Sequence, residues 1–334
     1  MFGYLVRRLL SGVLVLIAIT FTVFTFYFYG PSDPAQAYCP KNICTPATLD
    51  AIRTNLGLDQ PVLQQYGEYM KGIVAGRDIS AGALTQHCSA PCLGISYKQD
   101  VEVTPFLASL FPATLSIAVG SSVIFLTVGV AIGVISARNR GKPLDRGLQG
   151  FTMLATAMPY YLVALLAFLF LISKWGIFPQ SGYVSPIGSE PGEGPLGWIK
   201  GMLLAWLVLG LFYTTAYARY SRGSMIEALN EDYVRTARAK GLTDRVVALK
   251  HAFRAALVPI VTIFGIDFAT ILAGTIFTEK IFSIQGIGLQ ALNSITNKDL
   301  PIIAGTVLFA ATLFVVTSVL VDVVYAALDP RVRL

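Results

Sequence analysis

The sequence has little charge and almost no histidine. Only 13% of its 334 residues are charged, whereas 54% are hydrophobic, and the mean hydropathy is +0.65. So few charges cannot cover the surface of a water-soluble protein of this length, so we expect lipid to solvate much of the chain. The two histidines, His87 and His251, are far apart, and no His-Glu-x2-His motif occurs, which argues against a metal-dependent hydrolase.

A phosphate-binding loop is also missing from the sequence. Gly-x4-Gly-Lys-Ser/Thr does not occur, so the chain cannot bind ATP in that way. The net charge of +6 would suit nucleic acid, but Lys and Arg stand in short clusters between apolar runs, which is typical of membrane topology signals. We therefore expect no catalytic residue, no resident metal or cofactor, and no nucleic-acid partner for this chain.

Six nearly charge-free stretches are long enough to cross roughly 30 Å of hydrocarbon as helices, and none alternates as a membrane β-strand would. They are Leu9–Ser32, Val103–Ala137, Gly147–Ser173, Gly201–Ala218, Ala255–Thr278 and Leu300–Leu328. We predict an all-α membrane protein with a first transmembrane helix in 1–30. A five-helix core in 104–334 follows, with helices at about 104–137, 147–173, 197–218, 257–279 and 300–326. The spacing Gly129-x3-Gly133 predicts close helix packing.

Clusters of Lys and Arg predict the orientation in the membrane. Dense clusters fall on one side of the predicted helices, whereas the cations on the other side are diluted over longer loops and matched by acids. The dense side is expected to be cytoplasmic. Both termini are then cytoplasmic in a bacterial plasma (inner) membrane, and residues 31–103 form an extracytoplasmic domain between the first two helices.

All four cysteines lie in this predicted extracytoplasmic domain, where an oxidising compartment favours disulfides. Cys39, Cys44, Cys88 and Cys92 can pair in three ways, and the sequence does not choose among them. His87 beside Cys88 raises the alternative of a metal site, but no second histidine accompanies it and the spacings differ from the usual zinc pattern. We expect two disulfides.

The most informative segment is the predicted cytoplasmic loop 219–258, which is too long and too regular for a simple connection. Gly241 is expected to end a helix with a positive φ, and Thr243 to cap a second short helix with Asp244 in its first turn. Before Gly241, an apolar residue recurs at every fourth position and predicts a helical stripe: Met225, Leu229, Tyr233 and Ala237.

The second short helix presents Val246, Val247 and Leu249 beside Arg245 and Lys250. One interpretation is a basic amphipathic helix that lies on anionic lipid. The other is a helix that inserts into a groove on a cytosolic partner protein. Acidic residues interspersed with the cations favour the protein partner.

One run resembles the coupling loop of ABC-importer permeases in their dipeptide/oligopeptide form: Asp232-Tyr233-Val234-Arg235-Thr236-Ala237-Arg238-Ala239-Lys240-Gly241, continuing to Leu257-Val258-Pro259. The broader family's Glu-Ala-Ala triplet would fall at Arg235-Thr236-Ala237, of which only the last alanine is kept. Further runs resemble the same family along the chain: Tyr4-Leu5-Val6-Arg7-Arg8-Leu9-Leu10, Leu56-Gly57-Leu58-Asp59-Gln60-Pro61, Phe111-Pro112-Ala113-Thr114-Leu115, Thr278-Glu279-Lys280-Ile281-Phe282, Gly286-Ile287-Gly288, and Val321-Asp322 with Leu328-Asp329-Pro330-Arg331.

The resemblance implies a type I ABC importer permease that moves di- or oligopeptides. It implies four kinds of partner: a homologous second permease, two ATPase subunits that bind ATP and Mg, an extracytoplasmic peptide-binding protein, and the peptide itself in a lipid membrane. The residues that it assigns to ATPase coupling are Arg235, Ala237, Gly241, Leu242, Thr243, Asp244, Arg245, Val246, Val247 and Leu249. Nickel chelates or another small solute stay open as cargo. A secondary transporter is the alternative of another class, although we find no inverted repeat.

Two acids lie within the predicted membrane helices. Asp267 is near the middle of the fifth, where a charge is unfavourable and by default functional. It either lines the translocation path and meets the peptide's amino terminus, directly or through water, or is a buried hydrogen-bonded acid between helices. Asp322 lies near the cytoplasmic end of the sixth helix, where pairing or snorkelling to the interface is expected.

Overall fold

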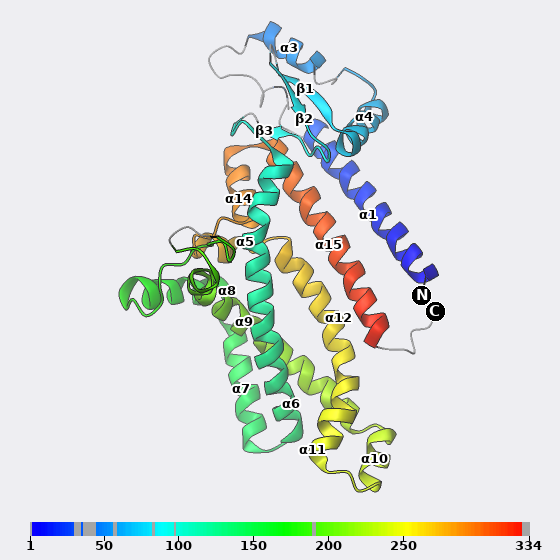
Figure 1. Ribbon diagram of the computed structural model, residues 1–334, viewed down its shortest axis with the longest axis vertical. Helices are drawn as coiled ribbons and strands as arrows, with labels where there is room; N and C mark the ends of the chain where they lie inside the picture. Colours follow the sequence, from blue (N-terminus) through cyan, green and yellow to red (C-terminus); the bar gives the residue numbers. More distant parts are fainter. Residues whose placement is uncertain are drawn as a thin grey trace. The chain divides into compact units, whose positions relative to one another are not determined.

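The computed structural model of the chain describes residues 2–29, 35, 45–55, 59–81, 84–96, 98–188 and 192–328. The cysteines Cys39 and Cys44, the Leu56-Gly57-Leu58 part of the external motif and the ending from Asp329 onward lie outside the described residues. The chain divides into two compact units, and Figure 1 labels the helices and strands from which they are built. The first comprises 1–112 with 286–316, and the second comprises 113–285 with 317–334.

The first unit is built on apolar helices that pack through aromatic and aliphatic side chains. Phe24, Tyr69 and Leu308 form one buried cluster, and Val103, Leu107 and Ile302 form another. The helices of this unit are α1 (Phe2–Tyr29), α3 (Pro46–Asn55), α4 (Val62–Ala75) and α14 (Ile287–Asn297), together with residues 103–112 of α5 (Val103–Ile124) and 300–316 of α15 (Leu300–Leu328).

Two small antiparallel sheets, which were not predicted from the sequence, lie in the first unit. Strand β1 (Arg77–Ala81) pairs with β2 (Leu84–Cys88), with Arg77 opposite Cys88. Strand β3 (Ile95–Ser96) pairs with β4 (Val101–Glu102). Strands this short give a weak periodic signal, so local sequence did not distinguish them from loops.

The second unit is helical throughout its regular structure and is organised around the long helix α9. Gly133 lies where α6 meets α9, because an added Cβ there would stand 2.5 Å from the Cβ of Ser221. The close packing predicted from Gly129-x3-Gly133 is therefore present. The elements are η1 (Phe125–Gly129), α6 (Val130–Arg138), α7 (Pro143–Ala157), α8 (Tyr160–Ala167), η2 (Phe168–Lys174), α9 (Pro195–Leu229), α10 (Asp232–Ala239), α11 (Asp244–Val246), η3 (Val247–Ala252), α12 (Phe253–Leu272) and α13 (Ile276–Ile281), where η marks a π-helical segment.

Five helical spans in the described chain are long and apolar enough to cross a membrane: Val6–Phe26, Val103–Arg138, Pro195–Leu229, Asp244–Leu272 and Leu300–Val323. The helix predicted over 147–173 differs, since α7 and α8 meet at a bend of 89°. Met158 has extended backbone angles, φ −87° and ψ 131°. Pro159 explains the break, because its ring disfavours a helical residue before it and it has no N–H. Counted as one broken span, this pair makes a sixth.

The predicted loop 219–258 is mostly helical in the structure. Helix α9 continues to Leu229, and an unbroken helical path leads from Asp244 through η3 into α12. The predicted stripe is split by the short link at Asn230–Glu231 between α9 and α10. After that link the buried positions are Val234 and Ala237, whereas Tyr233 is 43% exposed, so Tyr233 does not belong to the inward face.

Candidate functional site

The turn between α10 and α11 is built around Gly241. Gly241 donates its N–H to the Arg238 carbonyl at 2.9 Å, and Leu242 donates to the Ala237 carbonyl at 3.4 Å. This pair of bonds is the Schellman pattern, which requires a left-handed residue just after the helix cap. Gly241 has the predicted positive φ, +76°. An added Cβ would meet open space among the described residues, so backbone conformation is what favours glycine here.

The residues predicted to couple to an ATPase divide into two groups. Ala237 and Val247 are 6% and 0% exposed, so they hold α10 and η3 within the second unit. Leu242, Val246 and Leu249 are 40%, 40% and 47% exposed, so these apolar side chains are accessible to another protein. The remaining members of the set are all exposed: Arg235, Gly241, Thr243, Asp244 and Arg245.

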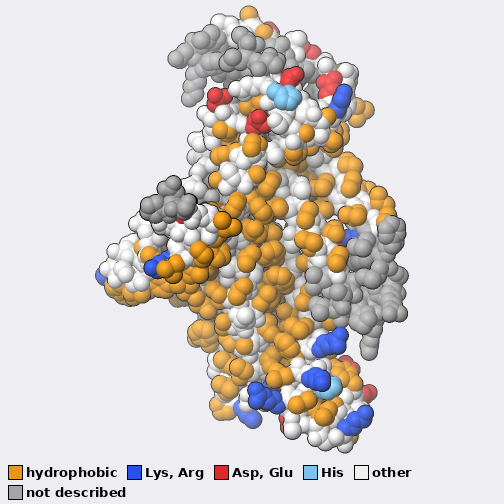
Figure 2. All heavy atoms as spheres, viewed as in Figure 1, with side chains coloured by type: hydrophobic (Ala, Val, Ile, Leu, Met, Phe, Trp, Pro, Cys, Tyr) orange, Lys and Arg blue, Asp and Glu red, His pale blue; other side chains and the backbone are white. Residues whose placement is uncertain are grey.

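Basic side chains surround this segment. In the second unit, Figure 2 shows Lys and Arg gathered around α10, α11 and the α6–α7 turn, while the rest of the visible face is mainly hydrophobic. Arg238 Nε lies 3.4 Å from Asp244 Oδ1 and thereby joins α10 to α11 across Gly241. Since these side chains are 48% and 85% exposed, the ion pair contributes at most about 1 kcal/mol.

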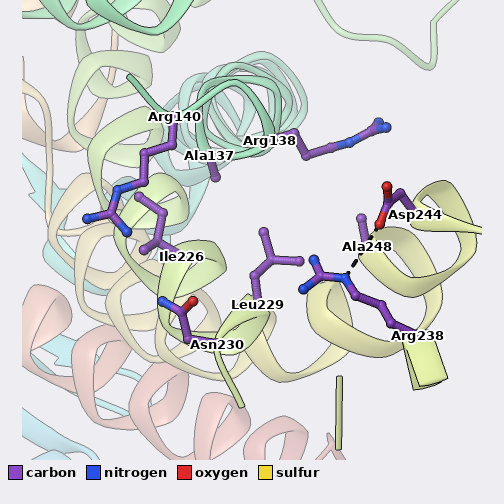
Figure 3. Close-up of a pocket in the computed structure, with 9 residues that line it drawn as sticks. All are labelled: Ala137, Arg138, Arg140, Ile226, Leu229, Asn230, Arg238, Asp244 and Ala248. Atoms are coloured by element: carbon purple, nitrogen blue, oxygen red, sulfur yellow. Dashed lines mark ion pairs between the residues drawn. The ribbon is translucent and has the colours of Figure 1, made fainter. Parts of the chain in front are cut away.

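A cavity of about 350 Å³ opens beside this ion pair, between the ends of α6 and α9 and the segment α10–α11–η3 (Figure 3). It brings the turn after α6 next to the predicted coupling segment, and this proximity was not predicted from the sequence. The lining residues are Ala137, Arg138, Arg140, Ile226, Leu229, Asn230, Arg238, Asp244 and Ala248.

In a second ion pair, between Asp145 of α7 and Arg222 of α9, the carboxylate is buried and the guanidinium side chain is 27% exposed. Both carboxylate oxygens accept hydrogen bonds from the guanidinium group at 2.8 Å, in the bidentate geometry that makes such pairs strong. Ser136 and the Gly141 N–H donate to the same carboxylate. This pair was not predicted from the sequence, although Asp145 is the single acid in the basic stretch 138–146.

Asp267 lies on α12 and accepts a hydrogen bond of 3.0 Å from the Tyr217 hydroxyl of α9. Aromatic rings gather beside this pair: Phe125 lies 4.5 Å from Tyr217, 5.3 Å from Tyr213 and 6.1 Å from Phe264, measured between ring centroids. Asp267 is only partly buried. It therefore has a structural partner and also keeps a surface outside the packed interior, so the geometry accommodates both predicted roles.

An apolar cavity of about 340 Å³ lies between α8, α9, α12 and α13. The chain is not helical where it passes the cavity, because Gly274 has a φ of +122° and α13 begins only at Ile276. The Thr275 hydroxyl at this break is buried and has no hydrogen-bond partner among the described residues. The lining residues are Tyr160, Leu209, Phe212, Tyr213, Thr270, Ile271, Gly274, Thr275, Ile276, Phe277 and Thr278.

In the first unit, Cys88 and Cys92 form a buried disulfide. His87 lies on the surface and its Nδ1 is 2.6 Å from Asp78 Oδ1. No group of three or more His, Cys, Asp and Glu side chains placed to hold a metal occurs in the described part of the chain. Nearby, burial raises the pKa of the Tyr69 hydroxyl to about 12, an effect that the Arg77 guanidinium partly opposes.

Comparison with known proteins identifies the family. The model of the binding-protein-dependent transport system inner membrane component matches residues 129–334, and the model of its N-terminal part matches residues 1–118. The chain belongs to this family. Dipeptide transport system permease protein DppB of Escherichia coli (strain K12) is 32% identical over 351 residues, which cover 100% of this chain and 99% of DppB. A Brucella abortus (strain 2308) protein named as a peptide transport system permease is 33% identical, with the same coverage.

Membership of the family makes the chain a permease component of a binding-protein-dependent importer in the bacterial inner membrane, with several membrane-spanning helices. A chain of the MetNI methionine ABC transporter, solved in inward-facing conformations, is 15% identical with a TM-score of 0.53 over 68% of this chain and 99% of that one. This likeness shows the fold, that of a type I ABC importer permease, as the sequence predicted.

Proposed function

We propose that the chain is a permease subunit of an ATP-driven importer for di- and oligopeptides. The observation that carries the proposal is its full-length similarity to relatives named for peptide or dipeptide transport. Nickel chelates or another small solute are the competing cargo on the same architecture. The apolar, aromatic cavity and the Asp267 carboxylate support peptides, because peptide side chains and amino groups complement these two features.

The partners in this proposal are a homologous second permease, two ATPase subunits and an extracytoplasmic peptide-binding protein. ATP and Mg bind to the ATPase subunits, and the chain itself contributes no catalytic residue or cofactor. Its termini and the segment 219–258 lie in the cytoplasm, and residues 31–103 lie outside. The clustering of Lys and Arg around α10, α11 and the α6–α7 turn supports this orientation.

Coupling runs through the segment from α10 to η3. The exposed Leu242, Val246 and Leu249 enter a groove on an ATPase subunit, while the buried Ala237 and Val247 anchor the segment to the membrane helices. Closure of the two ATPases moves this segment, and the membrane helices rock between inward and outward access. Asp267 lines the path for the peptide.

The test is reconstitution of the complete importer in proteoliposomes with a labelled dipeptide, a longer peptide and a nickel chelate. ATP-dependent uptake of peptides but not of the chelate is the expected result. Asp267→Leu should lower uptake while complex assembly stays intact. Uptake of the chelate in place of peptides would refute the proposed cargo, and full peptide uptake by Asp267→Leu would remove that residue from the path.

A further inference from the structure

The apolar cavity adjoins Asp267 on two helices at once. On α12, Thr270 and Ile271 line the cavity and follow Asp267 by three and four residues, which places all three on one helix face. On α9, Tyr213 lines the cavity and precedes Tyr217, the hydrogen-bond partner of Asp267, by four residues. Cavity and carboxylate are therefore neighbours, about 5 Å apart along the helix axes.

The chemistry of this site is that of a small-ligand pocket. Its volume of about 340 Å³ is lined mainly by aliphatic and aromatic side chains, among them Phe212 and Phe277. The Tyr160 hydroxyl is engaged by Thr278 at 2.7 Å. The buried Thr275 hydroxyl has no partner in the described chain, and such a group favours a ligand that supplies one. A largely apolar pocket with few polar groups is typical of ligand sites, and broken helices mark them in transporters.

We propose that the cavity and Asp267 form one subsite for the first residue of a peptide. The Asp267 carboxylate accepts hydrogen bonds from the free α-ammonium group, the cavity holds an apolar first side chain, and the Thr275 hydroxyl is available to the peptide backbone. Charge complementarity selects this occupant, because a lipid chain would leave the carboxylate and the hydroxyl unused. The inference rests on the proposed transport of peptides.

Photolabelling tests the subsite directly. The purified importer is labelled without the binding protein, so that selection by that protein does not enter. The probe is a tripeptide with photo-leucine as its first residue, and two further probes carry an N-acetyl group or photo-leucine in the third position. We expect the first probe to label residues 209–213 and 270–278. N-acetylation should reduce this labelling at least about tenfold, and third-position photo-leucine should label other segments.

Two variants, each with a matched control, test the two parts of the subsite separately: the Asp267 carboxylate and the apolar cavity. Asp267→Asn keeps the shape of the side chain and should abolish the difference in photolabelling between the free and the acetylated probe. The control is Thr262→Ala, at an exposed position of the same helix, which should preserve that difference. Phe212→Ala should weaken labelling by photo-leucine. Leu211→Ala, whose parent side chain is 51% exposed on the neighbouring position of α9, should not.

The outcomes separate this inference from the proposed function. Equal labelling by free and acetylated probes would overturn the subsite, and so would labelling of the cavity by a photoactivatable fatty acid instead of peptide. If the importer, reconstituted in proteoliposomes together with its binding protein, still imports peptide after either result, the proposed function stands without the subsite. If it imports no peptide at all, the proposed function fails and the subsite fails with it.

Discussion

Two arginine–aspartate pairs lie in the same part of the second unit and differ in burial and geometry. Asp145 is 4% exposed and receives two hydrogen bonds of 2.8 Å from Arg222. Asp244 is 85% exposed and meets Arg238 at one contact of 3.4 Å. The first pair joins α7 to α9 and also binds the end of α6, whereas the second only bridges the turn from α10 to α11.

The difference separates the part of the molecule that must hold its shape from the part proposed to move. A buried bidentate pair is strongly unfavourable to break, because either partner would be left as an uncompensated charge. An exposed pair can separate at a cost of almost no free energy, because water solvates the two separated charges nearly as well as they solvate each other. The helices α6, α7 and α9 are thus fixed to one another, while α10 and α11 are placed by a helix cap and by a few buried apolar side chains.

The largest expected effect is from Arg222→Ala. It leaves the Asp145 carboxylate buried without its arginine, so the free energy of unfolding should fall by about 3–5 kcal/mol. Thermal unfolding of the purified protein in detergent measures this. Arg219→Ala is the control, since Arg219 is an exposed residue of the same helix. Similar losses in both variants would show that the buried pair is not what joins these helices.

Val247→Asp and Val246→Asp should separate anchoring from partner contact. Val247 is fully buried, so an unpaired charge there should lower stability by several kcal/mol and reduce the yield of folded protein. Val246 is 40% exposed, so Val246→Asp should fold normally and lose its ATPase subunits. Thermal unfolding and co-purification measure the two effects. Normal ATPase binding and transport by Val246→Asp would exclude this side chain from the coupling contact.

Gly241→Val should disturb coupling with a smaller effect on stability. Valine resists a φ of +76° at a cost of about 1–2 kcal/mol, so α11 should be misdirected while the membrane helices stay inserted. We expect ATP hydrolysis that peptide no longer stimulates, measured in proteoliposomes. Gly241→Asn should recover part of the coupling, because asparagine tolerates this conformation better. Equal behaviour of the valine and asparagine variants would exclude the backbone explanation.

The smallest effect is expected for Asp244→Asn. Removing the exposed pair with Arg238 should lower the free energy of unfolding by less than about 1 kcal/mol, and added salt should reduce that difference further. Asp232→Asn, which removes the exposed pair of Asp232 with Arg235, is a matched control. Thermal unfolding at low and high salt provides the measurement. A loss of ATPase binding in Asp244→Asn alone would show that Asp244 contacts the partner rather than only Arg238.

Several features of this protein follow from local sequence. Long apolar runs predicted the membrane helices because a helix must satisfy its own backbone hydrogen bonds in lipid. The positive φ of Gly241 could also be predicted from local sequence. A helix that ends in the Schellman pattern needs a left-handed residue after its cap, and glycine adopts that conformation without a Cβ penalty. The proline at Pro159 is a local signal for the break between α7 and α8, but the apolar run through it led to the prediction of one helix over 147–173.

Contacts between distant residues were decided only by the tertiary structure. Asp145 and Arg222 are 77 positions apart, and Asp267 and Tyr217 are 50 apart, so no local period joins them. Likewise, sequence placed Val246 and Val247 on one short helix, but only packing determined that Val247 points inward and Val246 outward. The physical reason is that composition and backbone preference specify which helices form, whereas the rotation of each helix against its neighbours specifies which side chains meet.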